Sequence, residues 1–313
     1  AGKLFNHSGS QKNGVPYLSA LHAQAKNQGL AMPLLVYGDA STASLIAPTK
    51  ISRSTFDIVE PNLRTTGQAA QWLPNDDYAL IKSLQASRAQ KIKNSGLQLT
   101  KQQMQMDDYY DAVFANTEGF KNFSALYLAL NEGELTKDNY TDALKFALTA
   151  MATGLGVSTD ITINGFDTHD NHDTRGLEAL NNLTNAVNML WHYAEQLGIS
   201  DRIVVSIASD FARTPHYNDG KGKDHWPYGS TILMQKNATW TNRVVGKTNE
   251  LQKGLKINPS SLQLDVNGVE LEPTHIHQNL RSYLGVTETT AAQKFSLSAA
   301  TPVDLLITTA QTV

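Results

Sequence analysis

A short run of carboxylates and imidazoles makes the second half of the chain the place where chemistry is expected. The stretch from Gly165 to Asp173 reads GFDTHDNHD and holds five potential metal ligands within seven residues. Carboxylate and imidazole together are the usual ligand set for Zn²⁺, and the same donors also suit Mn²⁺ or iron. Aspartates in such turns also cap helices. Two interpretations are therefore open: Asp167 and His169 bind a metal, or they belong to a solvated polar turn.

A second polar group follows an apolar run at residues 202–208. An aspartate at the end of a buried strand must be paired, hydrogen-bonded or metal-bound, because an isolated buried charge is costly. Arg213 is one partner available to Asp210. Alternatively, Asp210 binds metal and Arg213 holds an anionic substrate oxygen, since the guanidinium fork suits phosphate or sulfate. The sequence leaves these alternatives open.

The third group is the pair Asp224 and His225, which follows a glycine-containing loop in the stretch 218–226 (NDGKGKDHW). Its spacing, and the lack of a bidentate glutamate, separate it from a calcium-binding loop. His275 and His277 fall in a predicted helix that begins near Pro273. Their i, i+2 spacing does not place them on one helical face, so we expect surface or packing histidines there.

The elements around these groups predict how they meet. Residues 157–164 favour a strand, residues 174–197 have leucines at helical spacing up to Gly198, and residues 202–208 form an apolar run typical of a strand buried on both faces. Strand, helix and strand in this order predict a βαβ unit with parallel strands. Ligand sites in such sheets lie beyond the C-terminal strand ends, so Asp167 and Asp210 are expected at one edge.

The first half of the chain is predicted to supply the rest of an α/β core. Residues 16–28 favour a helix, 32–37 a short buried strand, and 40–75 a loop region with short elements. From 76 to 153 a helical period dominates. It includes a stripe with Leu80, Leu84 and Ile92, a region with Met104, Val113, Phe114, Phe120, Leu126 and Leu130, and a stripe with Tyr140, Leu144, Leu148 and Met151. We expect this segment to form a helical layer packed against the sheet.

Composition excludes several classes of function. The 313 residues are 41% hydrophobic, carry a net charge of −3 with a pI near 6.3, and contain no apolar run of 18 residues. A basic field for nucleic acid and a membrane span are therefore not expected. The absence of cysteine excludes disulfides, thiolate metal sites and cysteine nucleophiles. No phosphate-binding glycine loop, GxSxG elbow or HExxH motif occurs.

At these groups the chain resembles a known family. The segments Gly165 to His169, Ser209 to Pro215 and Gly222 to Pro227 are similar, in order and interval, to the signature series of domain-of-unknown-function family 1501. The earlier segments His7 to Ser10 and Tyr17 to Leu21 resemble the middle of such proteins. The resemblance covers nearly all of the chain.

The resemblance implies membership of the clan of alkaline phosphatases, sulfatases and phosphoglycerate mutases. It implies one domain over 1–313, a three-layer α/β/α sandwich with a mainly parallel central sheet. This domain would contain the helix-rich segment 76–153 and a site-bearing βαβ segment at 157–230. It also implies a site for one or two divalent metal ions, with zinc as the first expectation and manganese or iron as the alternatives. The implied metal ligands are Asp167, His169, Asp210, Asp224 and His225.

The same resemblance implies export, and so a periplasmic or secreted protein. Members commonly carry a twin-arginine or similar signal, and the start Ala1-Gly2-Lys3-Leu4 is expected to be an internal one. Clan enzymes take a metal-binding aspartate and their nucleophile from the N-terminal part of the fold. We expect that part to precede Ala1, and an N-terminal fragment of the same protein is a candidate partner.

Two functions compete at this point. The first is a metal-dependent hydrolase of small phosphate or sulfate esters, in which Arg213 holds the anion. The second is an exported binding or structural protein that keeps the fold without catalysis. A departure from the clan favours the second, since many members have Asp-His where this chain has Asp210-Phe211.

Overall fold

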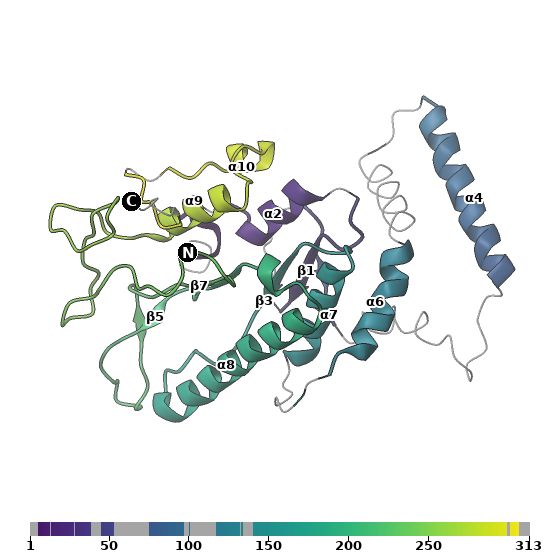
Figure 1. Ribbon diagram of the computed structural model, residues 1–313. Coiled ribbons are helices and arrows are strands. Elements are labelled where there is room, and N and C mark those ends of the chain that lie inside the picture. Colours follow the sequence, from purple (N-terminus) through teal and green to yellow (C-terminus); the bar gives the residue numbers. More distant parts are fainter. Residues whose placement is uncertain are drawn as a thin grey trace.

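The computed structural model describes residues 6–12, 14–27, 29–38, 45–52, 75–96, 100, 117–131, 133, 140–298 and 301–306. Within them a three-stranded parallel sheet has the order β2-β1-β3. Strand β1 (Leu34–Tyr37) lies between β2 (Thr49–Lys50) and β3 (Ser158–Ile161). The apolar sequence of β1 is what a central strand covered on both faces requires. The strands predicted at 32–37 and 157–164 are thus confirmed (Figure 1).

Helices pack on both faces of this sheet. Because successive side chains of a strand point to opposite faces, Leu34 and Val36 lie on one side of β1 and Leu35 on the other. Helix α2 (Leu18–Lys26) covers the first side, and helix α7 (Thr141–Ala152) covers the second. The chain is therefore a mixed α/β protein with a small parallel sheet packed by helices.

Glycines end two of the predicted helices. The stripe of α7 buries Leu144 and Leu148, and Gly154 follows the helix with φ of 71°. Helix α8 (His172–Gln196) is followed by Gly198 with φ of 66°. Such left-handed residues favour glycine because a Cβ is unfavourable there, and they terminate helices. Both helices are confirmed, and so is the predicted stop at Gly198.

The face that α8 buries differs from the predicted leucine stripe. Leu177 and Leu180 are 61% and 53% exposed. The buried face is formed mainly by small residues and two large ones: Gly176, Ala179, Ala186, Met189, Tyr193 and Ala194. Small side chains permit the close approach of the preceding loop, where a Cβ at Gly165 would stand 3.2 Å from that of Ala179.

The predicted parallel βαβ unit is wrong. Strand β4 (Val205–Ile207) does lie within the apolar run, but it pairs antiparallel with β7 (Ile232–Met234), and β3 belongs to the other sheet. Ser206 is exposed, so β4 is not buried on both faces. An apolar run gives no information on its partner, and here a later apolar strand provides it. A further antiparallel pair joins β5 (Ala212–Arg213) and β6 (His225–Trp226).

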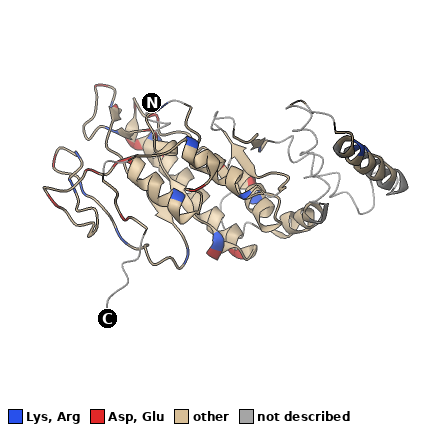
Figure 2. Ribbon diagram, turned by 90° about the horizontal axis from the view of Figure 1, so that it is seen from above, with Lys and Arg blue, Asp and Glu red and all other residues tan. Residues whose placement is uncertain are grey.

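Only part of the helix-rich segment 76–153 forms the helical layer that was predicted to pack against the sheet. Helix α4 (Asn75–Asn94) begins where predicted, but Leu80 and Leu84 are 56% and 60% exposed, and Figures 1 and 2 show α4 apart from the sheet. Helix α6 (Thr117–Ala129) does pack, since Phe123 is buried against Phe146 of α7, 4.9 Å between ring centroids. Met104, Val113 and Phe114 lie outside the described residues.

The C-terminal part adds a second core. The 3₁₀ helix η1 (Ser200–Arg202), helix α9 (Pro273–Tyr283) and helix α10 (Thr290–Lys294) complete the described elements. Ile257 and Leu280 lie at the centre of this core. His275 and His277 are both buried: His275 completes a capping box at the start of α9, and Nε2 of His277 lies 2.9 Å from the Asn6 carbonyl oxygen. Both are packing residues, as predicted.

Candidate metal centre

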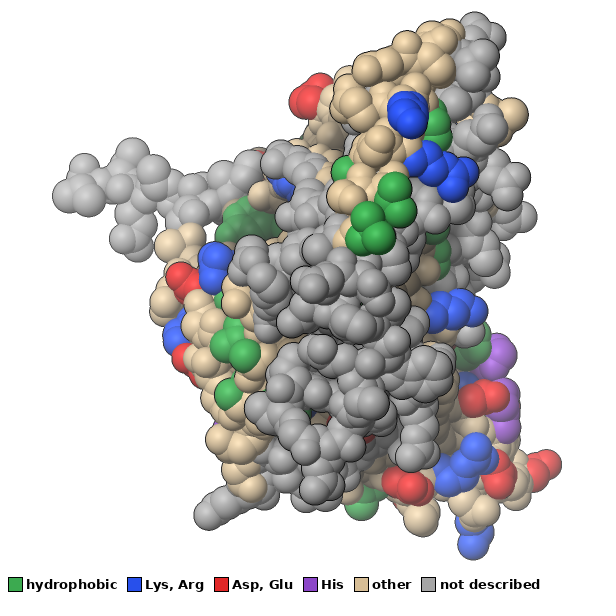
Figure 3. Space-filling model, turned by 90° about the vertical axis from the view of Figure 1, so that its right-hand side faces the viewer, with side chains coloured by type: hydrophobic (Ala, Val, Ile, Leu, Met, Phe, Trp, Pro, Cys, Tyr) green, Lys and Arg blue, Asp and Glu red, His purple; other side chains and the backbone are tan. Residues whose placement is uncertain are grey.

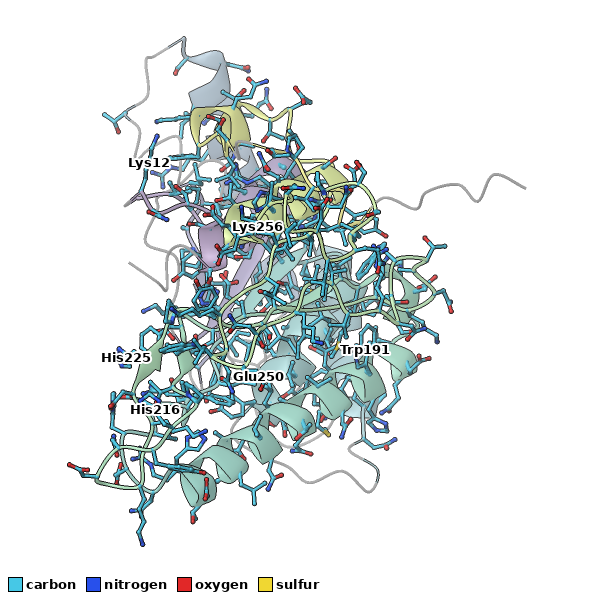
Figure 4. The ribbon with its side chains drawn as sticks, turned by 90° about the vertical axis from the view of Figure 1, so that its left-hand side faces the viewer. Lys12, Trp191, His216, His225, Glu250 and Lys256 are labelled. Carbon is cyan, nitrogen blue, oxygen red and sulfur yellow. The ribbon has the colours of Figure 1, made fainter. Side chains whose placement is uncertain are left out.

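Two loops meet where the predicted ligands lie. Strand β3 leads into the turn of residues 167–173, which ends at the start of α8, and the loop of residues 214–224 connects β5 to β6. The loop crosses the turn through backbone hydrogen bonds, from His172 N to Lys221 O and from Lys223 N to Thr168 O, both 2.9 Å. Figure 4 shows His216 and His225 at this end of the molecule, and Figure 3 shows histidines among charged side chains at the corresponding corner.

The contact between the loops requires a glycine at 222. A Cβ on Gly222 would lie 1.9 Å from both the carbonyl carbon and the carbonyl oxygen of His169. Any other residue would push the two backbones apart, because real Cβ contacts never approach so closely. Gly222, which belongs to the glycine-containing loop noted in the sequence, thus sets the distance between the loop and the turn.

Asn218 joins the same loop to the site. Its Oδ1 accepts hydrogen bonds from the backbone N–H of Gly220 and Gly222, at 3.0 and 2.9 Å. Its Nδ2 donates to the His169 carbonyl at 3.0 Å and to Asp224 Oδ1 at 3.1 Å. Sequence reasoning gave Asn218 no role. The signal was present, because Asn before Asp-Gly is typical of a turn closed by its own side chain.

Three potential ligand atoms come together in front of these loops. Oδ1 of Asp167, Nε2 of His169 and a nitrogen of His225 lie within 4.8 Å of one another. Nε2 of His169 is 3.1 Å from Asp167 Oδ1 and 3.2 Å from His225 Nε2. Zinc–ligand bonds of about 2.0–2.1 Å in a tetrahedron place neighbouring ligand atoms about 3.3 Å apart. The two distances from His169 Nε2 are close to this value, so Asp167, His169 and His225 could hold a metal ion such as Zn²⁺.

Asp224 lies on the other side of the His169 ring. His169 Nδ1 is 3.1 Å from Asp224 Oδ1, so an Nδ1–H donated there leaves the Nε2 lone pair facing Asp167 and His225. Hydrogen bonds from Asn218 and then from His169 hold the pKa of Asp224 below its usual value. A carboxylate behind a metal-binding histidine fixes its tautomer and orientation. The geometry thus gives Asp224 an orienting position.

Arg213 reaches the same group from β5. Its Nη2 donates to Asp167 Oδ1 at 2.5 Å, and its Nη1 donates to the Lys223 carbonyl at 3.1 Å. The hydrogen bond from Arg213 is the main cause that lowers the pKa of Asp167. Arg213 is paired with His225 in the β5–β6 register, and the Phe211 ring lies against His225 with centroids 3.8 Å apart.

Asp210 does not join this group. Its Oδ1 accepts hydrogen bonds from Phe211 N at 3.2 Å and from Ser209 Oγ at 3.3 Å, and its carbonyl accepts one from Asn6 Nδ2 at 2.6 Å. The contacts within the described residues give Arg213 an acidic partner in Asp167 rather than in Asp210. Of the predicted ligands, the structure brings together Asp167, His169, Asp224 and His225.

A family model described as "Protein of unknown function (DUF1501)" matches residues 7–280. The chain belongs to this family. No match to a curated protein or to a solved structure was found. Since the family description names no activity, a proposed function depends on the site itself. Among the described residues, no helix is both long and apolar enough to cross a membrane.

Proposed function

We propose that this protein is an exported, metal-dependent hydrolase of phosphate or sulfate esters. The observation that carries the proposal is the convergence of Asp167, His169 and His225, with ligand atoms within 4.8 Å of one another. These three residues would hold the metal, for which zinc is the first choice and manganese or iron the others. Such an ion supplies Lewis-acid polarisation and charge neutralisation at an ester oxygen.

An alkaline phosphatase-like fold, a three-layer α/β/α sandwich, is part of the proposal. Two observations support it. The described parallel sheet has helices on both faces, and the turn with Asp167 and His169 follows the C-terminal end of β3. That end of a parallel strand is where α/β proteins place their ligands. The proposed periplasmic or secreted location depends on the family resemblance alone.

The residues around the ligands have distinct roles in this proposal. Asp224 orients His169 through its Nδ1, and Asn218 holds both Asp224 and the His169 backbone. Arg213 offers a planar pair of N–H donors that matches the oxygens of a phosphate or sulfate group. The substrate is therefore expected to be a small anionic ester. Figure 2 shows acidic and basic residues interspersed in that view, which does not favour nucleic acid as a partner.

A non-catalytic binding or structural role is the second candidate. It is favoured by the position of Asp210, whose carboxylate accepts hydrogen bonds from Phe211 N and Ser209 Oγ instead of joining the ligand group. Without the Asp210 carboxylate the site has fewer ligands than predicted. It would then bind a single ion, and a protein with such a site need not turn over a substrate.

The two functions are separated by a turnover screen. Zinc-loaded protein would be assayed on a panel of phosphate and sulfate esters beside two variants, Asp167→Ala and Asp170→Ala. Asp170 is the matched control, because it lies in the same turn but pairs with Arg175 and is not in the ligand group. We expect turnover that Asp167→Ala abolishes and Asp170→Ala retains. Zinc-loaded protein that turns over no ester would contradict the enzyme proposal and leave the binding role.

A further inference from the structure

The guanidinium of Arg213 contacts the atoms that a metal would use. Its Nη2 lies 2.5 Å from Asp167 Oδ1, and its Nη1 lies 3.3 Å from His169 Nε2. These are two of the three ligand atoms of the proposed site. The positive charge of Arg213 therefore lies where a divalent ion would bind. It contacts a carboxylate oxygen and an imidazole nitrogen that the ion would also need.

We propose that Arg213 and the metal compete for Asp167 and His169, so that metal binding releases the guanidinium to bind a tetrahedral oxyanion. This inference rests on the proposed metal site, and it adds that the metal binds before the anion. The reason is electrostatic. A guanidinium and a divalent cation repel each other, and the Nη2 donor at 2.5 Å occupies a lone pair of Asp167 Oδ1 that an ion would also use.

Two contacts of the Arg213 guanidinium do not involve the ligand atoms, and they keep it near the ligand group when Nη2 leaves Asp167. Arg213 lies in β5, opposite His225 of β6, and its Nη1 also donates to the Lys223 carbonyl at 3.1 Å. The guanidinium carbon stands 5.4 Å from the centre of the Phe211 ring. Its side chain is 15% exposed, whereas that of Asp167 is 76% exposed. A small rotation that breaks only the Asp167 contact would therefore leave the guanidinium beside the ligand group.

Without metal, the same contacts oppose anion binding. The donors of Arg213 are engaged by Asp167 and Lys223, and the exposed Asp167 carboxylate would repel an anion. With metal bound, Asp167 is neutralised and Nη2 is released. The anion-binding site is accordingly complete only after the metal has bound.

The first test measures zinc affinity in Arg213→Gln, beside Arg175→Gln. Arg175 is a matched control, because it is a cation of the same turn that bonds Asp170 and the Asp167 carbonyl but none of the three ligand atoms. Competition between the protein and a chromophoric chelator gives the affinities. Arg213→Gln is expected to bind zinc roughly fivefold more tightly than wild type, the factor expected when a partly exposed ion pair no longer has to be broken. Arg175→Gln is expected to change the affinity by less than about twofold.

The second test measures binding of inorganic phosphate by calorimetry, with chelator-treated and zinc-loaded protein. Zinc-loaded wild type should bind phosphate, and the chelator-treated protein should not. Zinc-loaded Arg213→Gln should bind phosphate about tenfold more weakly than wild type, since a charge-assisted pair of donors is lost. One substitution would then strengthen metal binding and weaken anion binding, which a disturbed fold would not produce.

The outcomes separate this inference from the metal site itself. Equal zinc affinities in wild type, Arg213→Gln and Arg175→Gln, or weaker zinc binding in Arg213→Gln with an unchanged melting temperature, would overturn the competition. Equal phosphate affinity in zinc-loaded wild type and Arg213→Gln would overturn the anion role. No zinc binding by wild type or by either variant would overturn the proposed metal site.

Discussion

Substitution of Gly222 by alanine should damage the metal centre although residue 222 is not a ligand. The added Cβ would lie 1.9 Å from the carbonyl carbon and oxygen of His169 and 2.3 Å from the Asp170 nitrogen. Ordinary van der Waals contact begins at 3.4 Å. The loop and the turn must therefore separate by about 1.5 Å, and neither neighbour is a flexible side chain that could move aside instead.

A shift of this size is large compared with what a metal site tolerates, which is about 0.5 Å. It moves the backbone of His169, and it strains the hydrogen bonds of Asn218 to Gly222 N and to the His169 carbonyl. Disruption of the contact that orients a ligand side chain, here Asp224 at His169 Nδ1, weakens metal binding by roughly 10- to 100-fold. We therefore expect Gly222→Ala to bind zinc at least tenfold more weakly than wild type.

The assay is a zinc titration against a chromophoric chelator, together with thermal unfolding. Gly220→Ala is the matched control, two residues away in the same loop, because a Cβ there would meet its nearest atoms at 3.5 and 3.6 Å. It should bind zinc like wild type. Gly222→Ala with wild-type zinc affinity and an unchanged melting temperature would refute the reasoning from the loop contact.

Two further predictions concern other carboxylates. Asp224→Ala, which removes the partner of His169 Nδ1, should weaken zinc binding roughly 10- to 100-fold in the zinc titration described above. A loss of zinc binding as severe as that of Asp167→Ala would instead identify Asp224 as a ligand. Asp160 of β3 accepts a 2.6 Å hydrogen bond from Ser19, and burial raises its pKa to about 6. Because the folded protein binds this proton more tightly than the unfolded chain, wild type should lose stability as the pH rises from about 4 through 6. Chemical denaturation across this range should show Asp160→Asn gaining up to about 3 kcal/mol relative to wild type, and parallel profiles would contradict the assignment.

Helices, strands and turns that are determined by residues close together in the sequence were predictable. Helices α7 and α8 have clear apolar periods and glycine stops, β1 is a short apolar run, and the polar turn after β3 directed attention to Asp167 and His169. These features depend on residues a few positions apart, which is the range over which period and turn chemistry act.

Features that depend on distant partners were not predictable. The run at 202–208 pairs antiparallel because Ile232–Met234 lies beside it, and nothing within the run determines that. Helix α8 buries Ala179 rather than Leu180 because the loop at Gly165 approaches closely there.

The positions of neighbouring site residues relative to His169 were also not predictable. Asp224 and His225 were both expected to be ligands. In the structure Asp224 lies at Nδ1 of His169, whereas His225 lies at Nε2, and only the three-dimensional path of the loop decides between these sides.

Metal content tests the central claim most directly. Elemental analysis would be made on wild type purified without chelator, and on Asp167→Ala and Asp170→Ala prepared in the same way. The account predicts close to one zinc, manganese or iron ion per chain in wild type and in Asp170→Ala, and loss of that ion in Asp167→Ala. Absence of metal from all three proteins, or a full complement in Asp167→Ala, would contradict a metal centre built on Asp167, His169 and His225.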